Sequence, residues 1–339
     1  MVFYVIMAKV KLFFRFRKAV TLKMKKQQKQ QLTPEQKKKK RQKTWSAIKR
    51  HKVAYLFLLP AVLGVFVFGY VTMPGMLLAF MDYDIFLGFK SPWVGFENVK
   101  RLFEIPEFTK SIVNTLKLSS LSKLINTPLV IIFALMINEL KNGFFKRFTQ
   151  TVSYLPHFLS TIAVVGIATT VLSFYGMIND FRVWMDADAE RVLWLTKQNL
   201  FIPIVLFIGT WKGIGWGSII YLATIAGIDP SLYEAAIIDG AGKFRQCWHI
   251  TLPGISTTAI MLFILGIGSL FSSNFDLIYS LQNPYIDFEV ISTVIYKKGI
   301  TQGNYHMSSA LGFVQGLISM VLVLGTNWVS KKINDVSIL

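Results

Sequence analysis

Cysteine is almost absent from this chain. Cys247 is the single cysteine among 339 residues, so an internal disulfide is excluded. The four histidines are scattered and no C-x-x-C pair occurs, so the sequence lacks the ligand spacing of a metal site. Charged residues are also scarce, at 16% against about 25% in an ordinary soluble domain. Together with a hydrophobic content of 53% and a mean hydropathy of +0.47, this composition predicts an integral membrane protein.

Motifs that bind nucleotides are missing too. The segment Gly240-Ala241-Gly242-Lys243 fails the spacing of a phosphate-binding loop, and Phe244 replaces the hydroxyl residue that would hold magnesium. Asp186-Ala187-Asp188 has the acidic pair with which some glycosyltransferases hold a metal–nucleotide. It has no nucleotide-binding fold around it, so we interpret it as a solvated loop. A G-x-G-x-G run is formed by Gly213, Gly215 and Gly217. No strand precedes it, as a dinucleotide-binding motif requires, so we expect these glycines to allow close packing of helices in the membrane. The chain is therefore predicted not to be an enzyme and to bind no cofactor itself.

Long apolar runs are the dominant feature of what is present. A membrane-spanning helix needs roughly 20 apolar residues, and six runs reach this length. Because these runs are continuous rather than alternating, they favour helices over a β-barrel. The sequence thus predicts an all-α membrane protein whose spans cover approximately residues 54–73, 112–137, 152–174, 201–226, 258–279 and 310–329.

Positive charge is concentrated in one segment. Residues 1–53 carry 18 Lys or Arg and one acid, Glu35, and hence +17 of the net charge of +19. Basic residues beside a first span stay in the cytoplasm, so six crossings predict that both the N-terminus and the C-terminus are cytoplasmic. The tail could neutralise nucleic-acid phosphates, but contact with anionic membrane lipid is the simpler interpretation. Met24 is an alternative start of translation.

The connection between the fourth and fifth spans has the signals of a structured loop. Asp229-Pro230 predicts a helix start, with Asp as N-cap and Pro at the first helical position. Nothing from Ser231 to Ile238 breaks a helix. Gly240 and Gly242 then permit a sharp turn. A second short helix is expected over Lys243 to Trp248, and Pro253 is expected to break the pattern before the next span.

The same connection carries a spaced pattern, E-A-A-x-x-x-G-x9-I-x-L-P. It resembles the cytoplasmic EAA loop of permease subunits in binding-protein-dependent ABC importers. That resemblance implies a coupling helix seated in a groove of a separate ATPase subunit, which uses ATP and magnesium. The residues implied to couple are Glu234, Ala235, Ala236, Gly240, Ile250, Leu252 and Pro253. Cys247 and His249 fall inside the loop, and His249 is assigned to the docking surface.

Further segments extend the resemblance over residues 54–339. Trp93-Val94-Gly95-Phe96-Glu97-Asn98 is similar to a W-x-G-x-x-N segment of sugar-importer permeases, and three other segments resemble the branch that takes up complex oligosaccharides and polysaccharide fragments: 154–158, 211–216 and 275–284. The implied fold is MetI-like. The implied partners are a second homologous permease, two ABC ATPase subunits and an extracellular lipid-anchored sugar-binding protein, and the implied location is the bacterial plasma membrane.

The predicted organisation has four parts. Residues 1–53 form a basic cytoplasmic tail, and residues 54–110 hold the first span and an extracellular loop. Residues 111–329 form the ABC type-1 transmembrane core with the EAA loop at 229–253. Residues 330–339 form a cytoplasmic C-terminal tail.

Polar and aromatic side chains within the apolar runs are candidates for the substrate path. Ionisable groups in a span cost roughly 2.5–3.5 kcal/mol on insertion scales and so indicate functional sites. Lys123 is expected to favour an acidic or highly hydroxylated glycan. Alternatively, Lys212 could extend to the interface, Asp276 could lie at the outer interface, and the aromatic residues could form interfacial belts. The candidates are Lys123, Asn126, Trp211, Lys212, Trp216, Tyr221, Asn274, Asp276 and Tyr279.

These observations predict the permease subunit of an ATP-driven oligosaccharide importer that works by alternating access. Two alternatives remain open at this point. An importer permease for a non-sugar solute would share the EAA loop but not the sugar-branch segments. A membrane scaffold without transport would explain the spans and the basic tail but not the spaced loop.

Overall fold

A computed structural model describes residue 46 and residues 49–141, 143–271 and 273–334, with side chains described as far as residue 328. Most of the predicted basic tail and the last five residues therefore lie outside the described residues. The described part is almost wholly helical, and its one strand-like pairing is a bridge between Met81 and Trp93. The all-α prediction is confirmed. The chain divides into two units, Met1–Met73 and Pro74–Leu339.

The described part of the first unit is one helical segment. Helix α3 (Lys52–Val65) continues into a π-helical turn, η1 (Phe66–Val71). Its residues are apolar on all faces, as expected of a helix buried in lipid. The candidate span runs from Lys52 to Phe80 and includes the predicted first span at 54–73.

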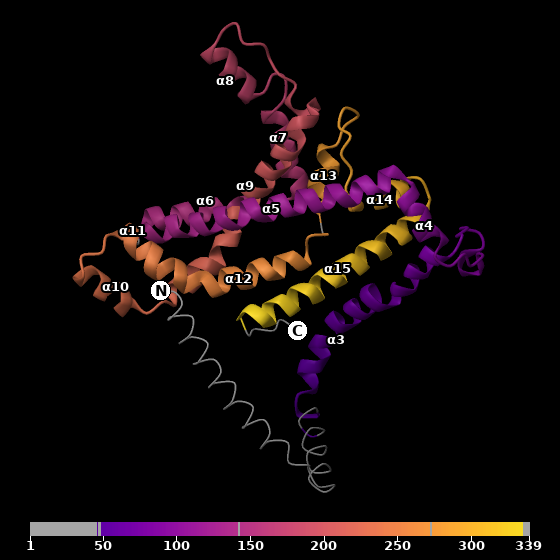
Figure 1. Ribbon diagram of the computed structural model, residues 1–339, viewed down its shortest axis with the longest axis horizontal. Coiled ribbons are helices and arrows are strands. Elements are labelled where there is room, and N and C mark those ends of the chain that lie inside the picture. The colour runs from indigo at the N-terminus through magenta and orange to yellow at the C-terminus, as the bar shows by residue number, and fades with distance from the viewer. Residues whose placement is uncertain (1–45, 47–48, 142, 272, 335–339) are drawn as a thin grey trace. The chain divides into compact units, whose positions relative to one another are not determined.

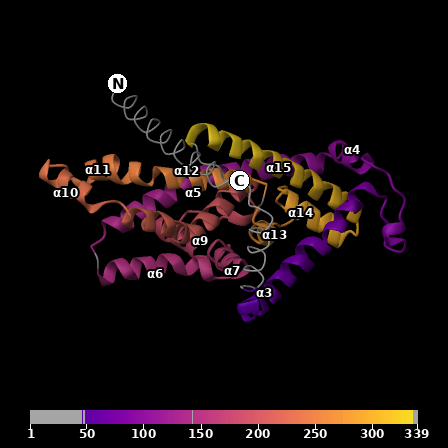
Figure 2. The same ribbon diagram turned by 90° about the horizontal axis from the view of Figure 1, so that it is seen from below.

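The second unit contains the remaining helices (Figures 1 and 2). In chain order they are η2 (Met73–Phe80), η3 (Gly88–Lys90), α4 (Glu97–Glu104), α5 (Pro106–Glu139), α6 (Phe144–Phe158), α7 (Thr161–Val171), α8 (Met177–Met185), η4 (Trp194–Thr196), α9 (Gln198–Ala226), α10 (Pro230–Ile238), α11 (Lys243–Gln246), η5 (Cys247–Thr251), α12 (Leu252–Gly268), α13 (Phe275–Leu281), α14 (Ile291–Ile295), η6 (Tyr296–Thr301) and α15 (Tyr305–Asn334).

Among the described residues, five continuous helical segments and one bent pair are long and apolar enough to cross a membrane. They correspond to the six predicted spans. The third span, however, is not straight, because α6 and α7 meet at an angle of 103°. Ser160 starts α7 by accepting a hydrogen bond from the Ala163 N–H at 3.2 Å.

The fifth predicted span was wrong as one continuous helix. Helix α12 ends at Gly268, and α13 starts only at Phe275. Inside a membrane the freed backbone groups of such a break need partners. Gln315 supplies one by donating to the Phe271 carbonyl at 2.7 Å, and the Asn274 side chain accepts from the Leu277 N–H at 3.2 Å to start α13.

The segment before α5 shows why its Trp, Gly and Asn occur together. Asn98 is buried and donates to the carbonyls of Ala79 and Met81 at 3.2 and 2.8 Å. Gly95 has a φ of +62°, a left-handed conformation that favours glycine. Trp93 stacks on Phe80 with a centroid distance of 5.7 Å. The W-x-G-x-x-N segment therefore folds the loop against α4.

Close helix packing depends on some of the glycines in α9. A Cβ at Gly215 would collide with the backbone of Ser153 in α6, and one at Gly217 would press on the Val130 side chain in α5. The packing prediction is confirmed for these two. Gly213 has no described atom close to its Cβ position, so the prediction was wrong there.

Candidate functional site

The loop between α9 and α12 starts with a capped helix. The Asp229 carboxylate accepts from the Ser231 N–H at 3.0 Å, and Pro230 occupies the first turn of α10. The backbone hydrogen bond from Ser231, helped by its side chain, lowers the pKa of Asp229. The predicted helix start is confirmed.

The turn after α10 is a Schellman motif. The Gly240 N–H donates to the Ile237 carbonyl at 3.0 Å, and the Ala241 N–H donates to the Ala236 carbonyl at 2.8 Å. Gly240 itself has a φ of +73°, which a residue with a Cβ adopts only at a cost. The glycine of the spaced pattern is thus required by the backbone.

Contacts within the loop and to its neighbours hold it in place. Gln246 is buried and donates to the Ala241 carbonyl at 2.7 Å. The Tyr233 hydroxyl is 3.0 Å from the Thr251 Oγ1 atom at the start of α12. The contact from Tyr233 joins α10 to the residue that precedes α12, and the bond from Gln246 joins α11 to the turn after α10.

The second half of the loop differs from the prediction. Helix α11 ends at Gln246, and the π-helical turn η5 leads directly into α12. Pro253 does not break the helix as expected, since it lies in the first turn of α12. Glu139 at the end of α5 pairs with Lys243 at 3.4 Å, so a third helix contacts the loop.

The loop presents apolar side chains on its surface. Ile238 is 86% exposed and Phe244 is 82% exposed. Glu234 and Ala235 are also exposed, whereas Ala236 is half-buried. In Figures 1 and 2, α10 and α11 lie at the opposite end of the second unit from α4 and α14. A rigid, capped helix with an apolar surface at one end of a helix bundle is suited to docking another protein.

A polar cavity of about 340 Å³ lies between α5, α9 and the α12–α13 segment. Four of its lining side chains lie on one face of α5 because their spacing is i, i+3, i+4 and i+7: Ser119, Ser122, Lys123 and Asn126. Asn126 donates to the Ser122 Oγ atom at 2.9 Å and accepts from the Thr210 hydroxyl at 2.6 Å. The cavity is therefore lined with hydroxyl, amide and ammonium groups.

A second cavity of about 280 Å³ adjoins the first, and the two share Gly209, Asn274 and Leu277 as wall residues. Lys212 lines it and donates to the Thr161 Oγ1 atom at 2.8 Å. His157 also lines it.

His157 is held by aromatic packing as well. Its ring is stacked on Trp216 with a centroid distance of 4.6 Å and an interplanar angle of 1°. Phe158 meets the same indole edge-on at 5.6 Å. His157 therefore packs against two aromatic rings and also lines the cavity.

The other candidates for the substrate path do not line the two polar cavities. Trp211 lines a different, apolar cavity between α7 and α9. Tyr221 is 4% exposed in a core cluster and lines neither polar cavity. Asp276 is exposed in the first turn of α13. Tyr279 stacks on Phe275 at 5.1 Å.

Several cavity residues were not among the predicted candidates. Sequence reasoning selected ionisable and aromatic groups and passed over the hydroxyl residues beside them. The polar residues of α5 recur at the helical spacing i, i+3, i+4 and i+7, and this pattern in the sequence could have identified the two serines. The residues missed are Ser119, Ser122, His157, Thr161, Ser269 and Ser273.

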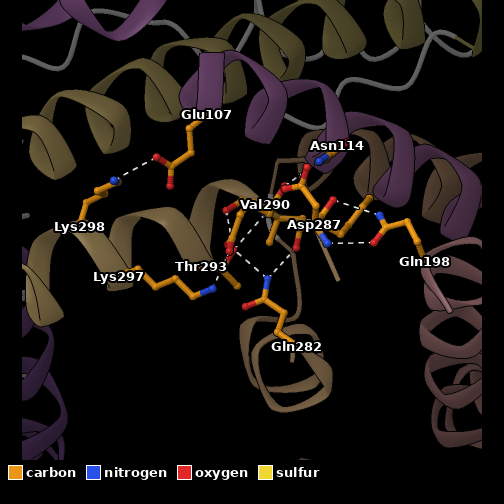
Figure 3. Close-up of polar contacts among 11 residues, drawn as sticks. Glu107, Asn114, Gln198, Gln282, Asp287, Val290, Thr293, Lys297 and Lys298 are labelled. Carbon is orange, nitrogen blue, oxygen red and sulfur yellow. Dashed lines mark hydrogen bonds and ion pairs between the residues drawn. The ribbon is translucent and has the colours of Figure 1, made fainter. Parts of the chain in front are cut away.

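The chain after α13 forms a polar network that includes Gln282, Thr293 and Lys297 (Figure 3). The Glu289 carboxylate accepts from Lys297 at 2.5 Å, from the Thr293 hydroxyl at 2.6 Å and from Gln282 at 3.2 Å. Glu289 and Lys297 are both more buried than exposed, so solvent screens this ion pair less than a surface pair.

Other bonds fasten the same segment to α5 and α9 (Figure 3). Asn114 of α5 donates to the Glu289 carbonyl at 3.0 Å. Gln198 of α9 exchanges two hydrogen bonds with the Asp287 backbone, at 3.0 and 2.9 Å. Residues 282–301 are therefore fastened to two helices, α5 and α9, at the end of the second unit away from α10.

The family described as "Binding-protein-dependent transport system inner membrane component" matches residues 126–335, which is more than half of the chain and includes the whole loop and most of the cavity walls. The chain belongs to this family. It is a multi-pass permease of the bacterial plasma membrane.

Relatives of the permease include two proteins of Bacillus subtilis (strain 168). Protein LplB is 40% identical over 294 residues, covering 86% of this chain and 92% of the relative. The "Polygalacturonan/rhamnogalacturonan transport system permease protein YteP" is 38% identical over 290 residues, covering 84% and 90%.

A solved structure is similar to the permease as well. It is described as "a bacterial ABC transporter involved in the import of the acidic polysaccharide alginate". The similarity has a TM-score of 0.77 and 37% identity, and it covers 86% of this chain and 99% of the other. The predicted permease fold is confirmed.

Proposed function

We propose that this permease is one subunit of an ATP-driven importer of oligosaccharides, with acidic polysaccharide fragments as its cargo. The observation that carries the proposal is the connection of a rigid docking loop to the walls of a polar cavity. Helix α12 makes this connection, since Thr251, the residue directly before it, contacts Tyr233 of the loop, and Gly266 near its end lines the cavity.

The chemistry of the cavity supports a glycan. Sugar hydroxyls both donate and accept hydrogen bonds, and the cavity presents serine hydroxyls and asparagine amides that do the same. Lys123 and Lys212 supply positive charge in the two adjoining cavities. Ammonium groups there favour a cargo with carboxylates. The names of YteP and of the alginate importer, which refer to acidic polysaccharides, agree with this.

The exposed apolar loop supports a partnership with ATPase subunits. The permease has no phosphate-binding loop in its sequence, so ATP and magnesium are assigned to two separate ATPase chains. A second, homologous permease completes the pathway, and an extracellular lipid-anchored binding protein delivers the sugar. A relative of known structure is described in complex with a pentasaccharide-bound periplasmic protein, in agreement with such delivery.

The loop end of the second unit is assigned to the cytoplasm, with both chain termini on the same side. The charge of residues 1–53 supports this orientation. The segment 282–301 then closes the outer side by its bonds to α5 and α9. ATP-driven closure of the ATPases pushes on α10, and alternating access follows when these outer bonds separate.

Deletion of the gene tests the proposal. Labelled oligosaccharides, neutral and acidic, are offered to cells with and without it. Loss of acidic oligosaccharide uptake, restored by the wild-type chain but not by Gly240→Val at the same membrane level, supports the proposal. Unchanged uptake of all the sugars would overturn the proposed cargo.

A further inference from the structure

Gly266 of α12 and Lys123 of α5 meet inside the first polar cavity. A Cβ placed on Gly266 would occupy the space of the Lys123 Cε and Nζ atoms, and the three nearest atoms to that position all belong to Lys123. Both residues line the cavity. The end of the Lys123 side chain therefore occupies space that is free only because residue 266 is a glycine.

The Lys123 ammonium has no carboxylate partner among the described residues. The side chains that share its cavity are hydroxyl, amide and aliphatic groups, without an Asp or Glu. A half-buried ammonium beside such groups gains most from a charged acceptor that the cargo supplies, since charge-assisted hydrogen bonds are the strong ones.

We infer that Gly266 is a positioning residue for cargo recognition: it fixes where the Lys123 ammonium stands, and thereby where the permease accepts a sugar carboxylate. This inference rests on the proposed function, because it takes the cargo to be an acidic oligosaccharide. Gly266 would then determine specificity without touching the cargo, because glycine has no side chain and acts through the position of Lys123.

Gly266 differs from a glycine that only allows helices to pack. At Gly215 the colliding atoms are the backbone of Ser153, which cannot move without shifting α6. At Gly266 they are the far end of a flexible lysine side chain, which can rotate away. Alanine at position 266 should therefore displace the ammonium and leave the helices in place.

A double-mutant cycle shows whether Gly266 acts by positioning the Lys123 ammonium or by allowing the helices to pack. Cells carrying the complete transporter are given a labelled galacturonan trisaccharide at a concentration that saturates uptake. Gly266→Ala is expected to lower the uptake rate about tenfold, which corresponds to ~1.4 kcal/mol of activation free energy. In a Lys123→Ala background the same Gly266→Ala change is expected to have no further effect, because the group that it displaces is gone.

A control and a second probe test the positioning role. Gly268→Ala changes a neighbouring glycine whose Cβ would meet a Val323 methyl group at 2.9 Å instead, and it should leave uptake unchanged. The second probe is the carboxyl-reduced trisaccharide, which has the same linkages and no charge. Its uptake should be unaffected by Gly266→Ala, and the purified variant should melt at the wild-type temperature.

Two results would overturn the inference alone. One is an equal loss of uptake from Gly266→Ala in the Lys123 and Lys123→Ala backgrounds. The other is a loss caused by Lys123→Ala with none caused by Gly266→Ala. If Lys123→Ala itself leaves trisaccharide uptake unchanged, the assignment of Lys123 to an acidic cargo fails and the inference fails with it.

Discussion

The conformation of Gly240 makes a quantitative prediction about the loop. Its φ of +73° lies in the left-handed region, where an L-residue with a Cβ is penalised by about 1–2 kcal/mol. No described atom lies within 4 Å of a Cβ placed there, so the penalty comes from the backbone alone. Gly240→Val should weaken the folded loop by a factor of about 5–30. Asparagine tolerates this conformation better, so Gly240→Asn is the matched variant.

The assay is the affinity of the purified permease pair for its ATPase subunits, together with transport-coupled ATP hydrolysis. We expect the affinity to fall by up to the same factor in Gly240→Val and to stay near the wild-type value in Gly240→Asn. Gly88→Val imposes a similar backbone penalty, at a φ of +56°, in a loop distant from α10, and it should leave the affinity unchanged. If Gly240→Val couples as well as wild type, a preformed loop is not required and the reasoning fails.

Three further predictions concern the cavity and the packing. Lys123→Met replaces the ammonium by an uncharged, unbranched side chain one atom shorter, and should lower saturated uptake of a galacturonan trisaccharide relative to its carboxyl-reduced form about tenfold, or ~1.4 kcal/mol of activation free energy. Gly215→Ala should reduce the melting temperature, because its Cβ collides with backbone, whereas Gly213→Ala should not. Asn98→Ala leaves the Ala79 and Met81 carbonyls without their amide donor and should destabilise the fold by about 1–3 kcal/mol in thermal or chemical unfolding.

Each of these has a contradicting result. An unchanged ratio of acidic to neutral uptake in Lys123→Met would remove the lysine from cargo recognition. Equal melting temperatures of the Gly215→Ala and Gly213→Ala variants would contradict the close approach of α6 and α9. A stable Asn98→Ala protein would show that water satisfies those carbonyls.

The sequence was sufficient for the positions of the spans and for the first half of the loop. Six apolar runs and one spaced pattern predicted the spans and the capped α10, because both depend on local signals: continuous hydrophobicity and the Asp229-Pro230 pair. The Schellman turn at Gly240 was likewise encoded locally.

The breaks in the helices were less predictable. The bend between α6 and α7 and the end of α12 at Gly268 interrupt apolar segments without a change of hydrophobicity. They depend on tertiary partners such as Gln315, which satisfies a carbonyl from another helix. Such contacts are not visible in a single sequence.

The cavity was only partly predictable for the same reason. Lys123, Asn126, Lys212 and Asn274 were identified because polar groups are costly in a span. Tyr221 looked equivalent in the sequence but belongs to the buried core. Which face of α9 meets the cavity is decided by how α5 and α6 pack on it.

The most direct test of the importer proposal is concentrative uptake by the purified assembly. The permease is reconstituted into liposomes with its partner permease, two ATPases and the binding protein, and a labelled galacturonan trisaccharide is supplied on the binding-protein side. We expect the sugar to accumulate on the ATPase side above its outside concentration only when ATP and magnesium are present there. Equilibration without ATP, or no entry of the acidic trisaccharide under any condition, would contradict the account.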